Sequence, residues 1–151
     1  MELTTRGRYA VMAMADIARH SRDMPVALSS VAERQQLSLA YLEQLIARLR
    51  RVGLLESARG RTGGYRLGKP ADQVSIAEIL IAVEEGTRMT RCSSGRGCVG
   101  ENRCITHHLW DALGAHIGSF FESVSLSDVI EGRPLFGSTR NMAPTIEAAA
   151  E

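Results

Sequence analysis

A glycine-rich segment at residues 59–64 separates two short strand-like runs, at residues 54–58 and 65–67. Glycine readily adopts the positive φ values that the tip of a tight hairpin requires. The segment therefore predicts a two-stranded hairpin, and the helical patterns that precede it restrict the fold further.

Apolar residues upstream of the hairpin recur at helical spacing. The first helix is expected to begin near Thr4 or Thr5, and its apolar stripe is Ala10, Ala13, Met14, Ile17 and Ala18. Ser30 and Glu33 match a capping box that opens a second helix through about Gln35.

A third helix is expected to begin after Ser38 as its N-cap and to end at Gly53. Its apolar stripe is Leu42, Leu45, Ile46 and Leu49. Residues 36–38 leave room only for a tight turn between the second and third helices. We therefore predict a mainly α protein, in which residues 1–72 form a winged helix-turn-helix DNA-binding domain with a two-stranded wing.

The chain after the hairpin contains a further helix and a segment without periodicity. Ser75 and Glu78 form a capping box for a fourth helix that is expected to end at Gly86. Residues 87–103 lack periodicity, and a loop of this length is usually functional or disordered. We assign residues 73–103 to a linking helix and a cysteine-bearing loop.

A long helix is expected to begin near Cys104. Its apolar stripe is Leu109, Leu113, Ile117, Phe120 and Val124. We interpret the stripe as a dimer seam rather than as a face packed on its own domain. Residues 104–132 then form a dimerisation helix and a short last helix opened by Ser125 and Asp128, and the polar, alanine-rich residues 133–151 form a flexible tail.

Charge is distributed unevenly along the chain. Residues 1–70 carry 12 Lys and Arg against 6 Asp and Glu, a net +6, whereas residues 71–151 carry 6 against 11, a net −5. A basic first half suits an anionic partner such as double-stranded DNA, although a solvated charged surface has the same composition. No apolar run approaches the ~20 residues that span a bilayer, and no export signal is evident, so a cytoplasmic protein is expected.

Side chains on the outer face of the third helix and on the wing are the candidate DNA contacts. Glutamine pairs with adenine, glutamate accepts from the cytosine amino group, and arginine neutralises phosphates or enters a minor groove. An ordinary solvated helix face and a plain charged turn are the alternatives. The candidates are Tyr41, Glu43, Gln44, Arg48, Arg50, Arg51, Arg59 and Arg61.

Three cysteines and a histidine follow the pattern C-x5-C-x5-C-x2-H, at Cys92, Cys98, Cys104 and His107. An odd cysteine count without an export signal favours metal or redox chemistry over disulfides. Four such ligands suit tetrahedral zinc or a two-iron cluster, with His108 as a rival ligand. We set aside a Cys–His nucleophilic enzyme because no orienting group is identifiable.

These motifs together resemble the IscR-type iron–sulfur cluster regulators, over residues 1–132. The matching segments are Leu3-Thr4, Arg6-Gly7-Arg8-Tyr9-Ala10, Ser38-Leu39, Tyr41-Leu42-Glu43-Gln44-Leu45, Arg59-Gly60, Gly63-Gly64-Tyr65 and Thr106-His107. The spacing of the three cysteines and the histidine is the most discriminating part of the match. Ala40 stands where some members have Ser.

The resemblance implies a non-enzymatic transcription regulator that acts as a homodimer and controls cluster-assembly genes. It also implies one 2Fe-2S cluster per subunit with Cys92, Cys98, Cys104 and His107 as ligands, base reading by Glu43 and Gln44, and a wing contact by Arg59. Two other functions remain open: a nitric-oxide or oxidant sensor that uses the same cluster, and a zinc-stabilised interaction module.

Overall fold

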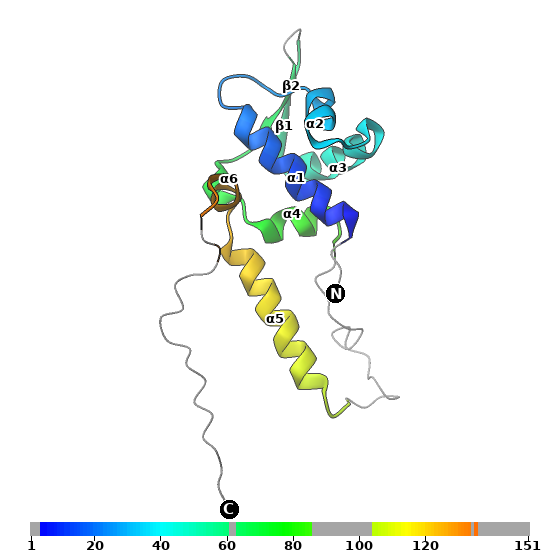
Figure 1. The fold of residues 1–151 in the computed structure, drawn as a ribbon, viewed down its shortest axis with the longest axis vertical. Coiled ribbons are helices and arrows are strands. Elements are labelled where there is room, and N and C mark those ends of the chain that lie inside the picture. Colours follow the sequence, from blue (N-terminus) through cyan, green and yellow to red (C-terminus); the bar gives the residue numbers. More distant parts are fainter. Residues whose placement is uncertain (1–3, 61–62, 86–103, 134, 136–151) are drawn as a thin grey trace, which may run out of the picture.

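The computed structural model describes residues 4–60, 63–85, 104–133 and 135. Its elements, in chain order, are α1 (Thr5–His20), α2 (Leu28–Gln35), α3 (Leu39–Arg51), β1 (Leu55–Ala58), β2 (Gly64–Leu67), the short 3-10 turn η1 (Ala71–Gln73), α4 (Ile76–Ala82), α5 (His107–Ser123) and α6 (Leu126–Glu131) (Figure 1). The described part of the chain is mainly helical with one two-stranded antiparallel sheet, as predicted for a winged helix.

Helix α1 lies at the centre of the fold and contacts α2, α3, α4, α6 and β2. Ala10, Ala13, Met14 and Ile17 are completely buried because they recur on one face of the helix. Burying a side chain the size of Met14 or Ile17 stabilises a fold by roughly 1.5–3 kcal/mol. The predicted start of this helix and its core-facing stripe are confirmed.

Helix α2 begins three residues earlier than the proposed capping box implies. Its N-cap is Ala27, and Ser30 lies inside the first turn, so the predicted box at Ser30 and Glu33 is wrong. The physical reason is a long-range contact: Val26 and Tyr65 of β2 exchange two backbone hydrogen bonds, of 2.9 and 2.8 Å. These bonds and the burial of Leu28 fix where the chain turns into the helix.

The turn between α2 and α3 is as tight as predicted. Gln36 adopts a left-handed conformation with φ 53°, and its N–H donates to the carbonyls of Ala32 and Glu33 at the end of α2. Helix α3 then begins at Leu39, and Gly53, with φ +78°, follows its end. The two helices therefore have the connection of a helix-turn-helix.

The wing is the hairpin of β1 and β2, with Leu55 opposite Leu67 and Ala58 opposite Gly64. A Cβ atom at Gly64 would lie 2.4 Å from the carbonyl oxygen of Val26, so no larger residue fits between the wing and the start of α2. Figure 1 shows the described parts of the hairpin strands extending beyond the helices. The glycines therefore serve close backbone approach as well as the turn.

Helices α4 and α6 begin side by side. Ile76 donates to the carbonyl of Val124 and Leu126 donates to the carbonyl of Val74, at 2.9 and 2.8 Å. The predicted capping box headed by Ser75 is confirmed, and Ser125 and Asp128, which were predicted to open the last helix, also form a capping box. This pairing fixes the C-terminal end of α5 to the core, while α5 runs away from the other helices (Figure 1).

Two predicted boundaries shift around the ligand-bearing segment. Helix α4 ends at Ala82 rather than at Gly86, because the backbone turns sharply where Glu84 adopts φ +56°. Helix α5 begins at His107, and Cys104 lies in the turn that precedes it. Both shifts shorten the helices on the two sides of residues 86–103.

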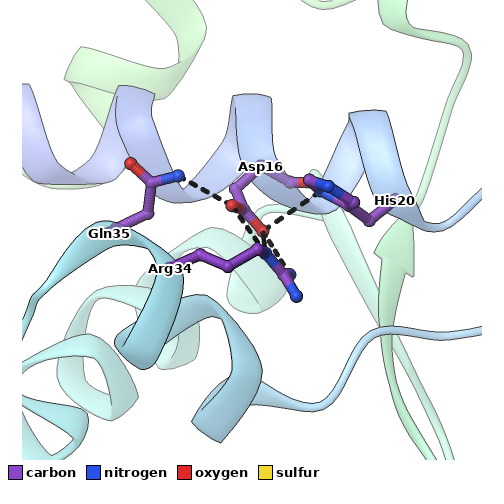
Figure 2. A network of polar contacts seen from close by, with 4 residues as sticks. All are labelled: Asp16, His20, Arg34 and Gln35. Carbon is purple, nitrogen blue, oxygen red and sulfur yellow. Dashed lines mark hydrogen bonds and ion pairs between the residues drawn. The ribbon is translucent and has the colours of Figure 1, made fainter.

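A buried carboxylate joins α1 to α2 (Figure 2). Asp16 is 4% exposed and accepts hydrogen bonds from Arg34 Nη2 at 2.6 Å and from Gln35 Nε2 at 2.7 Å. Arg34 Nε also donates to both carboxylate oxygens, and His20 Nδ1 lies 3.5 Å from Oδ1. Burial opposes ionisation, but the hydrogen bonds from Arg34 and Gln35 hold the pKa of Asp16 below its ordinary value of 3.8.

We expect Asp16→Asn to lower the free energy of unfolding by about 1–3 kcal/mol at pH 7, since it removes a buried charge that three groups satisfy. Because the folded-state pKa lies below the unfolded value, the contribution is present above about pH 3.8 and is lost as pH falls through the folded pKa. Urea unfolding between pH 7 and pH 3 measures it. Exposed Asp23→Asn is the control, and equal losses in both variants would contradict the assignment.

Candidate DNA-binding surface and metal centre

The outer face of α3 carries the side chains predicted to contact DNA. Leu42, Leu45, Ile46 and Leu49 are buried, which turns the other side of the helix outward. Glu43, Gln44, Arg50 and Arg51 are exposed, and Tyr41 and Arg48 are half-buried. The structure thus brings six of the eight predicted DNA contacts onto one helix.

The other two predicted DNA contacts belong to the wing. Arg59 is exposed at the end of β1, next to Gly60, whose φ is +119°. Arg61 lies outside the described residues. Strand β1 packs against α3, so the wing and the outer face of α3 form parts of one rigid unit.

A hollow of about 340 Å³ lies between the first turn of α1 and α3. Tyr41, Gln44 and Arg48 line it from α3, and Thr4 and Arg6 line it from the start of α1. The sequence analysis did not single out Thr4 or Arg6 as parts of this surface. Only the long-range packing of α1 on α3 brings them there, and no local pattern reports that packing.

Arg48 is not an isolated cation on the surface. Its Nη1 lies 2.7 Å from Oε2 of Glu84, in the turn that follows α4. The hydrogen bond and the charge of Arg48 lower the pKa of Glu84, which is therefore ionised at neutral pH. Arg48 is predicted from sequence to neutralise phosphates, and no local pattern indicates this acidic partner.

The neighbouring Glu85 closes the start of α1. Its carboxylate is buried and accepts from the backbone N–H of Thr4 at 3.0 Å and from the Thr4 hydroxyl. Burial opposes ionisation, yet these hydrogen bonds and that from the Gly7 N–H hold the pKa of Glu85 below its ordinary value. The turn after α4 is thus fixed to α1 through Glu85, and it also carries Glu84, which pairs with Arg48 of α3 at the surface.

Two of the four predicted metal ligands lie within the described residues. His107 begins α5 and is buried at 8% exposure, and its N–H donates to the carbonyl of Cys104 at 3.0 Å. Cys104 Sγ lies 3.4 Å from the Thr106 hydroxyl. Cys92 and Cys98 lie outside the described residues, so the structure does not bring the whole set together.

The imidazole of His107 has the environment expected of a ligand. Its Nδ1 is buried and has no hydrogen-bond partner, and an unsatisfied buried nitrogen is unfavourable unless something binds it. The rival His108 is exposed. Within the described residues no three His, Cys, Asp or Glu side chains cluster as a metal site. The orphaned nitrogen therefore fits a metal or cluster whose other ligands come from outside those residues.

The apolar stripe of α5 is exposed at one end and buried at the other. Leu109 is 59% exposed, and Leu113 and Ile117 are partly exposed. Phe120 packs partly against the core, and Val124 is only 4% exposed within the core of its own chain. Val124 therefore has little surface to offer a partner, in contrast to the predicted seam residues before it.

Comparison with known proteins places the chain in a family. Residues 3–132 match the Rrf2 model, described as an iron-dependent transcriptional regulator. The chain belongs to the Rrf2 family. It is 47% identical over 135 residues to the HTH-type transcriptional regulator IscR of Yersinia pseudotuberculosis, covering 89% of this chain and 82% of that protein. It is 49% identical over 133 residues to IscR of Photorhabdus laumondii, covering 88% and 81%.

Solved structures of Rrf2 relatives have the same fold. IscR of T. potens superposes with a TM-score of 0.73 and 34% identity, over 89% of each chain. CymR of B. subtilis, titled a global cysteine regulator, gives a TM-score of 0.76 and 28% identity, over 89% of this chain and 99% of its own. The chain is thus a helix-turn-helix, DNA-binding transcriptional regulator of the IscR type. No described helix is both long and apolar enough to cross a bilayer.

Proposed function

We propose that this regulator senses iron–sulfur cluster status through a 2Fe-2S cluster and controls cluster-assembly genes. The observation that carries the proposal is the buried, unpartnered Nδ1 of His107, three residues after Cys104. Cys92 and Cys98 would supply the remaining thiolates. A bound cluster would supply sensitivity to redox state and to oxidants. Imidazole ligation raises the reduction potential of a cluster above that of a cluster with only thiolate ligands.

The ligand set has one chemically weak member. Imidazole binds metal as a neutral ligand, whereas the three thiolates bind metal as anions. His107 would therefore hold the fourth position least firmly. Because His107 is the first residue of α5, its ligation would also tie the start of that helix to the cysteine-bearing segment.

DNA contact is proposed for the outward face of α3 and for the wing. Tyr41, Glu43 and Gln44 lie toward the N-terminal part of α3, from which recognition helices read base edges. Arg48, Arg50 and Arg51 would neutralise phosphates in the last turn. Arg59 and Arg61 would reach a neighbouring groove from the hairpin tip.

Dimerisation is proposed through the exposed part of the α5 stripe, at Leu109, Leu113, Ile117 and Phe120. Large apolar side chains that are left half-exposed along one helix favour association with a partner. Complete burial of each such side chain contributes about 1.5–3 kcal/mol of stabilisation. A two-fold arrangement of two α3 helices would select near-palindromic operators. Val124 would contribute only through the core of its own chain.

We expect Arg59→Ala to weaken operator binding by about 1–3 kcal/mol, because it removes a cation from the exposed hairpin tip. Gel-shift titration at fixed salt measures the change. Arg133→Ala, which removes the same charge beyond α6, should leave binding unaltered. Equal affinities of Arg59→Ala and the parent protein would exclude a wing contact by this residue.

We expect Leu113→Asp to give a folded monomer, since a dimer seam at α5 would then bury an unpaired charge. Ala115→Asp places the same charge on the opposite side of α5, where Ala115 is exposed, and should remain dimeric. Sedimentation velocity of both variants separates the two results. A folded Leu113→Asp protein that stays dimeric would rule out this seam.

The cofactor proposal is tested by visible absorbance and iron content of anaerobically purified protein. Cys92→Ser, Cys98→Ser and Cys104→Ser should each lose most of the iron and the colour. His107→Ala should lose colour faster in air than the parent, and His107→Cys more slowly, because a thiolate replaces the labile ligand. Exposed His108→Ala is the matched control.

Three results would overturn parts of this assignment. Identical decay in His107→Ala and the parent would exclude His107 as a ligand. A colourless protein that holds stoichiometric zinc would favour the zinc-stabilised interaction module. A coloured protein that releases DNA only on exposure to nitric oxide or an oxidant would make the same cluster a sensor of those agents.

A further inference from the structure

We propose that Glu84 competes with the DNA backbone for Arg48, and that this competition sets the affinity of the regulator for its operators. The two side chains come from distant elements: Arg48 from the last turn of α3, and Glu84 from the turn after α4. Arg48 Nη1 and Glu84 Oε2 are 2.7 Å apart. A phosphate oxygen is the same kind of acceptor, a charged oxygen that an arginine fork recognises.

The backbone of Glu84 is held in place by contacts that do not involve Arg48. Its φ of +56° is uncommon for a residue other than glycine, and Arg6 Nη2 donates to its carbonyl oxygen at 3.2 Å. The adjacent Glu85 is buried against Thr4. The carboxylate of Glu84 is therefore presented to α3 by a fixed turn rather than by a freely moving loop.

Arg48 lies between two hollows on the surface. One, of about 390 Å³, separates α3 from α4 and is also lined by Glu84 and Ile81. The other, of about 340 Å³, lies toward the start of α1 and is also lined by Tyr41 and Gln44, two of the proposed base-reading residues. Arg48 thus borders open space in two directions, with the acid in one direction and the proposed DNA face in the other.

The pair is open enough to exchange partners. The side chain of Glu84 is 73% exposed and that of Arg48 is 35% exposed, so water can solvate either group when the pair separates. Exposed ion pairs of this kind are weak and are screened by salt. When Arg48 turns to a phosphate, it gives up its ion pair with Glu84, and the free energy lost with that pair weakens the binding of DNA.

The inference rests on the proposed DNA face of α3, and its test is a double-mutant cycle with Glu84→Gln, Arg48→Gln and the double variant. Affinity for an operator duplex is measured between about 50 and 200 mM salt. Glu84→Gln should tighten binding about two- to fivefold at the lowest salt. For this variant, the slope of log affinity against log salt concentration should steepen by about one. The reason is that Arg48 then binds a phosphate without first leaving a carboxylate.

The gain should vanish in the double variant, since no cation is left for Glu84 to occupy. Glu131→Gln is the matched control because it removes the same charge from another surface ion pair. Glu131 is the last residue of α6, and its Oε2 lies 2.6 Å from Nη2 of Arg133. Equal gains in Glu84→Gln and Glu131→Gln would reduce the effect to net charge and overturn the competition. A gain that persists in the double variant would also overturn it.

Two further measurements keep the result interpretable. Thermal unfolding checks that each variant is folded, and Glu84→Asn provides a second neutral residue that tolerates positive φ. Gln44→Ala tests the DNA face independently. If Gln44→Ala weakens binding but the Glu84–Arg48 cycle shows no coupling, only the competition fails. If neither α3 variant alters binding, the proposed DNA face itself fails.

Discussion

The burial of one face of α1 is the constraint on which the other elements depend. The buried face of α1 packs against α2, α3, α4, α6 and the wing strand β2. It consists of Ala10, Ala13, Met14 and Ile17. Small residues at positions 10 and 13 let neighbouring helices approach closely, and the larger Met14 and Ile17 fill the centre. Because α1 contacts elements from both halves of the described chain, a defect in this face would disturb α3 and α6 together.

Polar contacts toward the two ends of α1 give the packed helices defined positions. Near its C-terminal end, Asp16 binds Arg34 and Gln35 in the last turn of α2, directly before the turn into α3. At its N-terminal end, Glu85 accepts from Thr4, and a Cβ atom added at Gly7 would lie only 2.8 Å from Glu85 Cγ. Apolar packing alone tolerates small rotations of a helix, whereas a buried carboxylate with several donors does not. These contacts therefore fix α2 and the turn after α4 relative to the two ends of α1.

The features that were predicted well from sequence are those that depend on local residue patterns. The stripe of α3, with Leu42 and Leu49, and the capping boxes headed by Ser75 and Ser125 depend on residues within a few positions of each other. The start of α2 was missed because Val26 pairs with Tyr65, thirty-nine residues away. Ser30 has the local composition of an N-cap, but a distant backbone pair and the burial of Leu28 determine the first turn instead.

In the candidate site, too, some features follow from local sequence and others only from the fold. The outward position of Glu43 and Gln44 follows from the helical period alone. The pairing of Arg48 with Glu84 joins α3 to the turn after α4, and no spacing along the chain predicts it. For His107, the motif with Cys104 suggested a ligand from sequence, but only the structure adds that its Nδ1 is buried and unpartnered.

The fold also determines how the segment that carries the proposed ligands is connected to the rest of the molecule. The chain from Glu85 to Cys104 carries Cys92 and Cys98, and its two ends lead into different parts of the molecule. One end is the turn fixed to α1 by Glu85 and to α3 by Glu84, and the other is the start of α5. Ligands within residues 86–103 and at the start of α5 would link that segment to the proposed dimer helix. Any signal that changed the ligation would then act at two places: the carboxylate facing Arg48, and the helix that sets the spacing of two DNA-binding domains.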